Sequence, residues 1–401
     1  MKGSKSKIVY DAIIFGFSCA GRLIGQRYRL LGKEHLKNVP FPVIFTVTHD
    51  SYFEIPALSR VYRALKPKPI FSVMAKKDFL SGEYLSTNFR VKSGALRAVL
   101  KLVDRLQLPL MLFRIMNVAS VHRPFIEKTL QKKDELKQEI SAQIDHFRDS
   151  LSQGMSTLIF PEGTTWGYGG LKRIRSACYQ LVDTIHGQYG KKVYILPINV
   201  KVDRLVRGAK DIFVNVGVPQ FVIKSKDEFN EYLFGALQRL HTITFSQIGA
   251  YYLKKICLVS GQTRQDVILT KDVLTAHIER VVRNVHAMVQ NQKLPAFDGK
   301  LVDRKYLAGK VNGFIKYCTR NNYFVEISRN RREKAYRLNG EKILASYPVK
   351  QYRKLNPVGF HANELTSLGE ELIDPLFDIP GVITMDSVPP APGGGTISLS
   401  P

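Results

Sequence analysis

The stretch Ser156–Thr165, which reads STLIFPEGTT, decides the fold of this chain. A short apolar run, with the length of a buried strand, leads directly into a polar loop. Pro161 fixes the direction in which the chain leaves the strand, and Gly163 lets other groups approach the backbone closely. The pattern predicts a strand over 156–160 whose carboxyl end presents Glu162. Taken alone, Pro161 to Gly163 also fit an ordinary turn.

A second stretch of the same kind lies nearer the N-terminus. The apolar residues 42–48 are followed by His49 and, five positions later, by Glu54. A histidine and a carboxylate at this spacing are either a general base with the group that orients it, or the polar residues of a turn. Ligands bind beyond the carboxyl ends of the strands in an open α/β sheet, so the loops at 49–54 and 161–165 can converge on one cleft.

Strand-like and helix-like segments alternate through about residue 220. Helical periodicity is clearest at 133–152, where apolar residues recur every three or four positions and Gly154 follows as a stop signal. The sequence therefore predicts the α/β class, with a mixed sheet flanked by helices. The expected strands cover residues 42–48, 69–75, 117–122, 156–160, 193–202 and 212–218, and an extra helical segment is expected around 93–106.

Beyond about residue 225 the pattern becomes mostly helical. Long helical segments are predicted at 228–258 and 270–292, the second opened by Thr270 as N-cap. A helix at 303–320 followed by a hairpin that ends at Leu338 resembles a winged helix. The predicted parts are an N-terminal amphipathic segment at 1–39, an α/β domain at 40–224, a helical C-terminal domain at 225–380 and a disordered Pro/Gly-rich tail at 381–401.

The chain is strongly basic. Lys and Arg outnumber Asp and Glu by 60 to 34, which gives a formal net charge of +26. Such an excess requires an anionic partner, which is a nucleic acid, an acidic membrane surface or a phosphorylated substrate. Charge alone does not choose among these. The four cysteines are far apart and show no C-x-x-C spacing, which argues against a zinc site or a disulfide framework.

The N-terminal run from Ile8 to Ile24 is the most apolar segment of the first hundred residues. Asp11 and Arg22 interrupt it, and it is too short to span a bilayer. Its basic flank and amphipathic pattern favour a helix that lies at a membrane surface. A helix packed on the following domain is the alternative.

The order of these stretches resembles a known family. His49-x4-Glu54, followed at a distance by Phe160–Thr164, is similar to motifs I and III of the glycerolipid acyltransferase superfamily, the H-x4-D acyltransferases. The resemblance covers roughly residues 40–220. Further matches are Ser51, Val73–Phe79, motif II at Val118–Arg123, a basic stretch at Gly170–Ala177, motif IV at Tyr194–Val200 and, faintly, Asn356–Glu364. Three departures from the pattern are Thr48 for Asn, Glu54 for Asp, and Thr165-Trp166 for Arg-Ser.

The resemblance implies an acyltransferase-like fold and a membrane-associated O-acyltransferase. A fatty acyl group would move from acyl-CoA or acyl-carrier protein to a hydroxyl of a glycerol phosphate or lysophosphatidate-type acceptor. His49 would be the general base and Glu54 its orienting group, in preference to Asp50, because adjacent side chains of an extended segment point to opposite faces. The implied substrate-binding residues are Ser51, Arg123, Glu162, Gly163, Thr164, Lys172 and Pro197.

Arg123 suits an acceptor phosphate, because a guanidinium binds phosphate through two parallel hydrogen bonds. No metal or cofactor is expected beyond the thioester co-substrate. The implied location is peripheral, at the cytoplasmic face of an anionic membrane. Alternative interpretations are an acyltransferase for a lyso-phospholipid, amino lipid or glycolipid, a catalytically inactive lipid-binding relative, and a nucleic-acid-binding protein that uses residues 303–338. Nucleic acid is the least favoured partner, because it leaves FPEGT unexplained.

Overall fold

The structure is a computed structural model that divides the chain into two compact units. The N-terminal unit comprises Met1–Trp166, Leu171–Val202 and Asp211–Thr242, and the C-terminal unit comprises Gly167–Gly170, Asp203–Lys210 and Ile243–Pro401. The residues described are 11–377 except 17, 20, 23–24, 50–53, 70, 77–93, 108–117, 122–132, 264–266 and 331–332. The predicted tail at 381–401 lies outside the described residues.

The N-terminal unit is built on a seven-stranded sheet with the order β1-β7-β6-β2-β5-β3-β4. Its strands are β1 (Gln26–Leu31), β2 (Val43–Val47), β3 (Phe71–Lys76), β4 (Val118–Val121), β5 (Ser156–Ile159), β6 (Tyr194–Val202) and β7 (Lys210–Val216). Its helices are η1 (Lys33–Leu36), α2 (Glu54–Ala64), α4 (Gly94–Arg105), α6 (Lys133–Ser152), α7 (Ala177–Tyr189) and α8 (Lys226–Arg239). All six predicted strands are present, and β1 is an additional strand.

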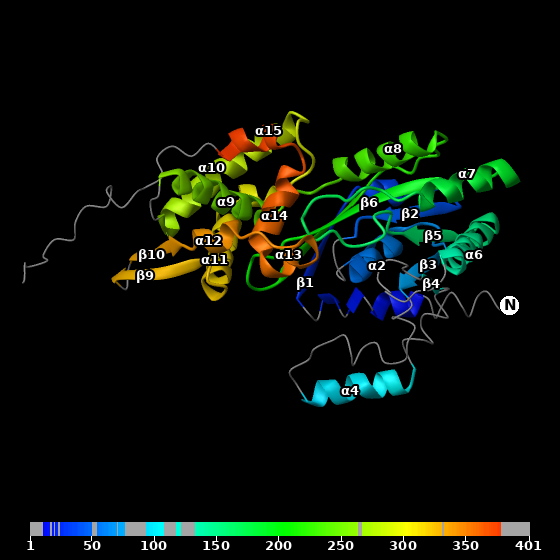
Figure 1. The fold of residues 1–401 in the computed structure, drawn as a ribbon, viewed down its shortest axis with the longest axis horizontal. Helices are drawn as coiled ribbons and strands as arrows, with labels where there is room; N and C mark the ends of the chain where they lie inside the picture. Colours follow the sequence, from blue (N-terminus) through cyan, green and yellow to red (C-terminus); the bar gives the residue numbers. More distant parts are fainter. Residues whose placement is uncertain are drawn as a thin grey trace, which may run out of the picture. The chain divides into compact units, whose positions relative to one another are not determined.

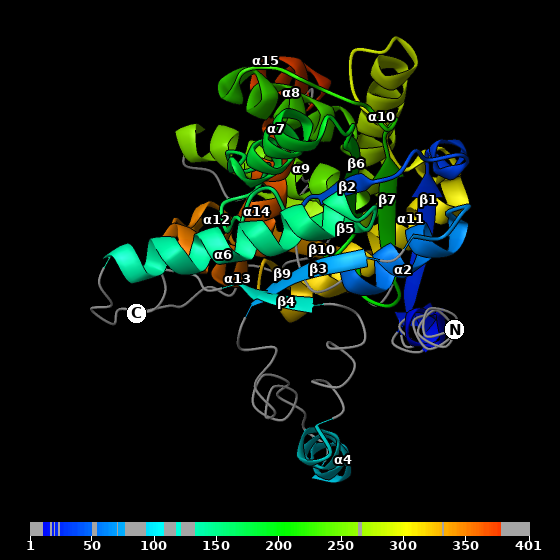
Figure 2. The ribbon, with the colours of Figure 1, turned by 90° about the vertical axis from the view of Figure 1, so that its right-hand side faces the viewer.

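The sheet is mixed, as the sequence predicts. β2 pairs in parallel with β5 and β6, and β3 pairs in parallel with β4 and β5, whereas β6 and β7 are antiparallel. Alternate residues of β2 enter different cores because successive side chains of a strand point to opposite faces. Val43 and Phe45 pack with α2, and Ile44 packs with α6, α7 and α8. Helices therefore cover both faces of the sheet (Figures 1 and 2).

The described part of residues 11–22 is helical and contacts the N-terminal unit. Ile14 is buried in the core formed with α2, and Asp11 pairs with Lys68 at 3.3 Å. Phe15, by contrast, is exposed. The contacts of Ile14 and Asp11 agree with the alternative of a helix packed on its domain. Contact of the Phe15 side of the helix with a membrane stays a prediction. Of the helices described, none is both long and apolar enough to cross a bilayer.

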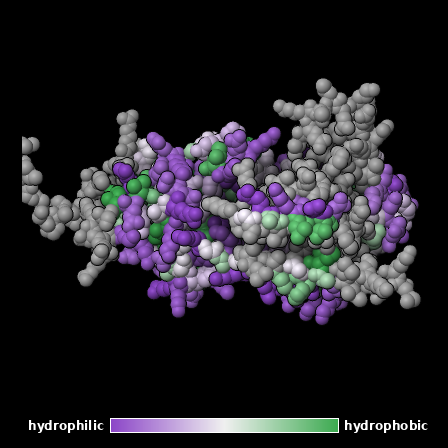
Figure 3. All heavy atoms as spheres, turned by 90° about the horizontal axis from the view of Figure 1, so that it is seen from below, coloured by the Kyte–Doolittle hydropathy of each residue, from purple (hydrophilic) through white to green (hydrophobic). Residues whose placement is uncertain are grey.

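Several large apolar side chains of the described residues remain exposed, and those of α4 are among them. Leu102 and Leu106 are 56% and 59% exposed. Figure 1 places α4 at the bottom of the view, and Figure 3 looks at that side from below. Green apolar atoms lie next to purple hydrophilic atoms on this side. The helix itself agrees with the helical segment expected around 93–106.

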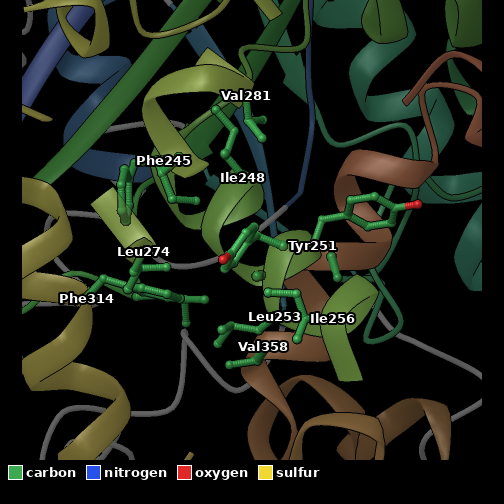
Figure 4. Close-up of a cluster of buried hydrophobic side chains, with 14 of the residues drawn as sticks. Phe245, Ile248, Tyr251, Leu253, Ile256, Leu274, Val281, Phe314 and Val358 are labelled. Carbon is green, nitrogen blue, oxygen red and sulfur yellow. The ribbon is translucent and has the colours of Figure 1, made fainter. Parts of the chain in front are cut away.

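The C-terminal unit packs around the central helix α9, as a close-up of its core shows (Figure 4). Side chains of α9 such as Phe245 and Tyr252 meet Leu274, Phe314 and Val358 from three other helices. The helices are α9 (Phe245–Thr263), α10 (Lys271–Gln290), η3 (Gly299–Val302), α11 (Arg304–Arg320), α12 (Gly340–Leu344), α13 (Val349–Leu355), α14 (Pro357–Thr366), α15 (Glu370–Ile373) and η4 (Asp374–Phe377). The strands are β8 (Ile268–Thr270), β9 (Phe324–Asn330) and β10 (Glu333–Leu338).

The helix predicted over 228–258 is instead two helices, α8 and α9. Between them, Ile243 donates its N–H to the carbonyl of Ala296, and its carbonyl accepts from Asp298. These bonds use the backbone groups that a continuous helix needs, so the helix stops. α8 belongs to the N-terminal unit, which ends at Thr242.

The helices and strands from β8 to β10 follow the order expected for a winged helix. α10 and α11 are followed by the β9–β10 hairpin, and β8 completes a small sheet with the order β8-β10-β9. Thr270 caps α10 by accepting the N–H of Val273 at 3.3 Å, as predicted. Residues 331–332 lie outside the described residues.

Candidate active site

The carboxyl ends of β2 and β5 bring the two polar stretches together. Thr46 lies opposite Ile159 in the parallel register of these strands. Three residues further along each chain come His49 and Glu162. The Glu162 side chain reaches across, and its Oε1 accepts the backbone N–H of His49 at 2.8 Å. The two loops therefore converge on one site, as their positions at the ends of strands predict.

Glu162 holds two parts of the site at once. Its second carboxylate oxygen, Oε2, accepts the backbone N–H of Lys172 at 2.9 Å. The side chain is only 3% exposed. Burial raises the pKa of the Glu162 carboxyl above its ordinary value, although the hydrogen bonds from His49 and Lys172 and the charge of Lys201 act in the opposite direction. Glu162 thus positions His49 and the basic stretch, in addition to the acceptor-binding role predicted for it.

The His49 ring is held on two sides. Its Nδ1 lies 3.9 Å from Oε1 of Glu54, and its ring packs on Phe160 with the centroids 4.5 Å apart. Nδ1 has no hydrogen-bond partner among the described residues. Glu54 is buried and is the first residue of α2, where the helix dipole favours a negative charge. With Nδ1 facing the carboxylate, the other ring nitrogen, Nε2, is the one available to act as a base.

Lys172 is one of the cations of the loop that follows FPEGT. Its Nζ donates to Thr164 Oγ1 at 2.7 Å and lies 5.7 Å from the centre of the Trp166 ring. Gly163 adopts φ +71, a left-handed conformation that favours glycine. The N–H of Gly163 donates to the carbonyl of Phe160 at 2.9 Å, so in this conformation it is engaged in a turn. The Gly163 N–H is therefore used within the loop, and Thr164 holds the Lys172 ammonium beside it.

Two further residues of the site have no counterpart among the predicted site residues. Thr48 stands where the family carries Asn, and its Oγ1 accepts the N–H of Val200 in β6 at 2.9 Å. Lys201, also in β6, is a lysine only 6% exposed. The sequence feature that could have identified Lys201 is its position as a charged residue inside the apolar strand 194–202.

The other predicted site residues fall in different places. Ser51, Arg123 and the rival orienter Asp50 lie outside the described residues, so their roles stay predictions. Pro197 is buried within β6, opposite Thr46. This position favours a role in supporting the sheet over direct contact with a substrate. Among the residues described, no group of three or more His, Cys, Asp or Glu side chains is placed to hold a metal ion.

The C-terminal unit includes the segment Gly167–Gly170, which begins three residues after FPEGT. Asn363 of α14 donates from its Nδ2 to the carbonyl of Tyr168 at 3.0 Å. A Cβ on Gly167 would lie 1.9 Å from the carbonyl oxygen of Val349, and one on Gly169 would lie 2.5 Å from that of Phe360. The backbone of this segment therefore packs directly on α13 and α14, and only glycine fits at these two positions.

Asn363→Asp is expected to loosen the segment 167–170. A carboxylate would face the Tyr168 carbonyl in place of the N–H donor, and a lost hydrogen bond of this kind shifts an opening equilibrium roughly tenfold. Limited trypsin digestion should show faster cleavage after Lys172 and Arg173, which follow the segment. Turnover should fall while the melting temperature stays near that of the wild type.

Lys254→Met is the matched control for this variant. Lys254 Nζ donates to the other side-chain atom of Asn363, Oδ1, at 3.2 Å, so its loss leaves the bond to Tyr168 intact. Because a carbonyl requires a donor and an ammonium requires an acceptor, the two contacts also fix which way the Asn363 amide points. Equal proteolysis of Asn363→Asp and Lys254→Met would contradict a positioning role for Asn363.

Comparison with known proteins agrees with the residues of this site. The Acyltransferase family model matches residues 27–201, a segment that contains the His49–Glu54 pair and FPEGT. The match agrees with the resemblance inferred from the motifs: residues 27–201 resemble the Acyltransferase family, which supports an acyltransferase function for this segment.

One solved structure with similarity to this chain is the crystal structure of the 1-acyl-sn-glycerophosphate (LPA) acyltransferase PlsC from Thermotoga maritima. The two chains share 14% sequence identity with a TM-score of 0.37, and the match covers 60% of this chain and 81% of that chain. No curated protein matches the sequence.

Proposed function

We propose that the protein transfers a fatty acyl group from a thioester donor, acyl-CoA or acyl-carrier protein, to a hydroxyl of a glycerol phosphate or lysophosphatidate-type acceptor. The observation that carries this proposal is the His49–Glu54 pair, with Nδ1 of His49 3.9 Å from the Glu54 carboxylate, at the edge of the sheet where Glu162 binds the His49 backbone. The motif order of the superfamily supports a lipid acceptor. The excess of cations in the first hundred residues fits an anionic lipid surface.

His49 acts as the general base in this mechanism. Its Nε2 takes the proton of the acceptor hydroxyl as the hydroxyl oxygen attacks the thioester carbonyl. The imidazolium that forms is stabilised by Glu54 across the Nδ1 side of the ring. When the tetrahedral intermediate collapses, the carbon–sulfur bond breaks and the imidazolium returns its proton to the leaving thiolate. The products are an ester and a free thiol, and His49 is neutral again.

The negative oxygen of the intermediate needs donors close to the reacting carbon. Lys172 is the candidate, since Glu162 and Thr164 fix its backbone and its ammonium group respectively. Arg123 is proposed to bind the acceptor phosphate, as the family motif implies. The protein itself is proposed to work at the cytoplasmic face of a membrane as a peripheral enzyme, without a cofactor beyond the acyl thioester.

A thiol-release assay with long-chain acyl-CoA, and in parallel with acyl-carrier protein, tests the proposal. Glycerol-3-phosphate and lysophosphatidate should each be offered as acceptor, next to a lyso-phosphatidylcholine, an amino lipid and a glycolipid. Release that depends on one of the first two acceptors supports the proposal. Release that depends on one of the other three would instead identify the alternative acceptor class, and no release with any acceptor from either donor type would contradict acyl transfer.

Glu54→Asp is expected to lower kcat by roughly tenfold or more. The shorter side chain withdraws the carboxylate from a ring nitrogen that it reaches at 3.9 Å, so the wrong tautomer of His49 becomes more populated. Glu54→Gln should lose at least as much, because it also removes the negative charge that stabilises the imidazolium. Full activity of Glu54→Gln in the thiol-release assay would remove Glu54 from the mechanism.

Nucleic-acid binding is the second candidate function, and one observation favours it. Lys305, Lys316 and Arg320 of α11 are exposed and lie on one side of the helix by their spacing. In a winged helix the corresponding helix contacts nucleic acid. A salt titration with duplex DNA, run beside one with anionic vesicles, separates the two candidates, since a protein that neutralises several phosphates loses DNA affinity steeply as salt rises.

A further inference from the structure

Helix α4 exposes an apolar stripe. Ala98, Leu102 and Leu106 follow one another at intervals of four residues, so they share one side of the helix, and all three are exposed. Leu106 lies just past the end of α4, but its N–H still donates to the carbonyl of Leu102 at 3.0 Å, which continues the helical turn. Leu102 and Leu106 are the two most exposed large apolar side chains of the described residues, at 56% and 59%.

A cationic stripe runs beside the apolar one. Arg97, Lys101 and Arg105 precede the three apolar residues by one position each and are also exposed. Asp104 is the one acidic residue of α4, and it is buried. The exposed surface of α4 therefore combines an apolar row about 12 Å long with a row of positive charge of the same length.

These two rows are the features of a helix that lies in the plane of a membrane interface. Such a helix inserts its apolar side among the acyl chains while its Lys and Arg side chains reach the lipid phosphates. We propose that α4 is a docking helix for an anionic lipid surface. A nucleic acid would attract the cations of α4 but would leave the exposed leucines without a partner, so the apolar row decides in favour of a bilayer.

The inference goes beyond the membrane contact expected of the N-terminal segment. It assigns the contact to a helix inside the acyltransferase domain, between the stretches that carry His49 and Arg123. It draws on the proposed function for one point: a lipid acceptor gives the domain a reason to hold its site at a bilayer. Vesicle binding itself requires no turnover, so the inference can be tested whatever the acceptor is.

Sedimentation with vesicles tests the proposal on the full chain. One set of vesicles is phosphatidylcholine, and the other is phosphatidylcholine with about a third of phosphatidylglycerol, a composition that supplies the negative surface on which such binding depends. The wild type should bind the anionic vesicles more tightly, and added salt should weaken the binding. Leu102→Asp/Leu106→Asp should lower the affinity at least tenfold. Lys101→Gln/Arg105→Gln should lower it roughly 30-fold, from about fivefold for each cation removed.

Val218→Asp/Val259→Asp is the matched control. Both valines are exposed, at 51% and 40%, and neither belongs to α4. This variant should bind anionic vesicles as the wild type does, which shows that two new carboxylates on the surface are not enough to abolish binding. Each variant should keep the melting temperature of the wild type, because the substituted side chains are exposed.

Three outcomes would overturn the proposal. The first is unchanged vesicle binding by Leu102→Asp/Leu106→Asp. The second is loss of binding in Phe15→Asp alone, which would move the contact to the N-terminal helix. The third is binding of the wild type to duplex DNA but not to anionic vesicles.

As an independent readout, Leu102→Asp/Leu106→Asp should retain turnover on a soluble short-chain acceptor and lose it on the same acceptor class embedded in vesicles. If neither acceptor is turned over by the wild type, the proposed function fails while the vesicle result still decides the role of α4.

Discussion

His49→Ala is expected to abolish acyl transfer, with kcat lower by about 100- to 10,000-fold. The substitution removes the Nε2 atom that takes the acceptor proton in the proposed mechanism. Binding of the acyl thioester should persist, because the substitution leaves the Glu162 contacts of the backbone intact. Thiol release from acyl-CoA in the presence of the preferred acceptor measures the loss.

His146→Ala is the control for this experiment. His146 is an exposed histidine of α6, so its loss changes the composition in the same way without touching the site. It should retain the wild-type rate. Turnover by His49→Ala equal to that of His146→Ala would rule out the general-base mechanism and with it the interpretation of His49 and Glu54 as a catalytic pair.

Much of the N-terminal fold is predictable because its strands are short apolar runs that lead into polar loops. β2, β5 and β6 appear within a residue or two of the expected positions, and α6 matches the periodic segment 133–152. The break between α8 and α9 was not predictable from periodicity. It depends on hydrogen bonds of Ile243 with Ala296 and Asp298, which are more than fifty residues away in the sequence.

The candidate site, like the fold, was predictable only in part. His49, Glu54 and Glu162 are identified by motif order, and the register of β2 with β5 explains why they meet. What each side chain holds was not predictable, because a buried carboxylate reveals its partners only in three dimensions. Glu162 was predicted at the acceptor, and the structure adds that its carboxylate accepts two backbone N–H groups. Nor could the sequence reveal that Asn363, 195 residues beyond Tyr168, contacts the segment 167–170.

Glu162→Gln is expected to lower kcat by about 100-fold, as displacements on the order of 1 Å can do. An amide has one acceptor oxygen, so it can serve either the N–H of His49 or that of Lys172, and its NH₂ group would face the other N–H. The base or the basic stretch must then move. Stability should change less than activity, because the orphaned N–H costs about 1–3 kcal/mol while loss of a buried negative charge offsets part of that cost.

The pH dependence separates this positioning role from a purely structural one. Burial raises the pKa of Glu162 above its ordinary value of 4.5, so between the two values the folded protein holds a proton that the unfolded chain has released. The contribution of Glu162 to stability is therefore full below pH 4.5 and is lost as the pH rises through the raised pKa. Urea unfolding at a series of pH values should show the wild type losing stability relative to Glu162→Gln across this window. The exposed Glu231→Gln should leave kcat unchanged, since its side chain lies on the surface of α8. A flat difference between wild type and Glu162→Gln, together with unchanged kcat, would contradict the positioning role, because a carboxylate that ties His49 to Lys172 cannot be replaced without moving one of them.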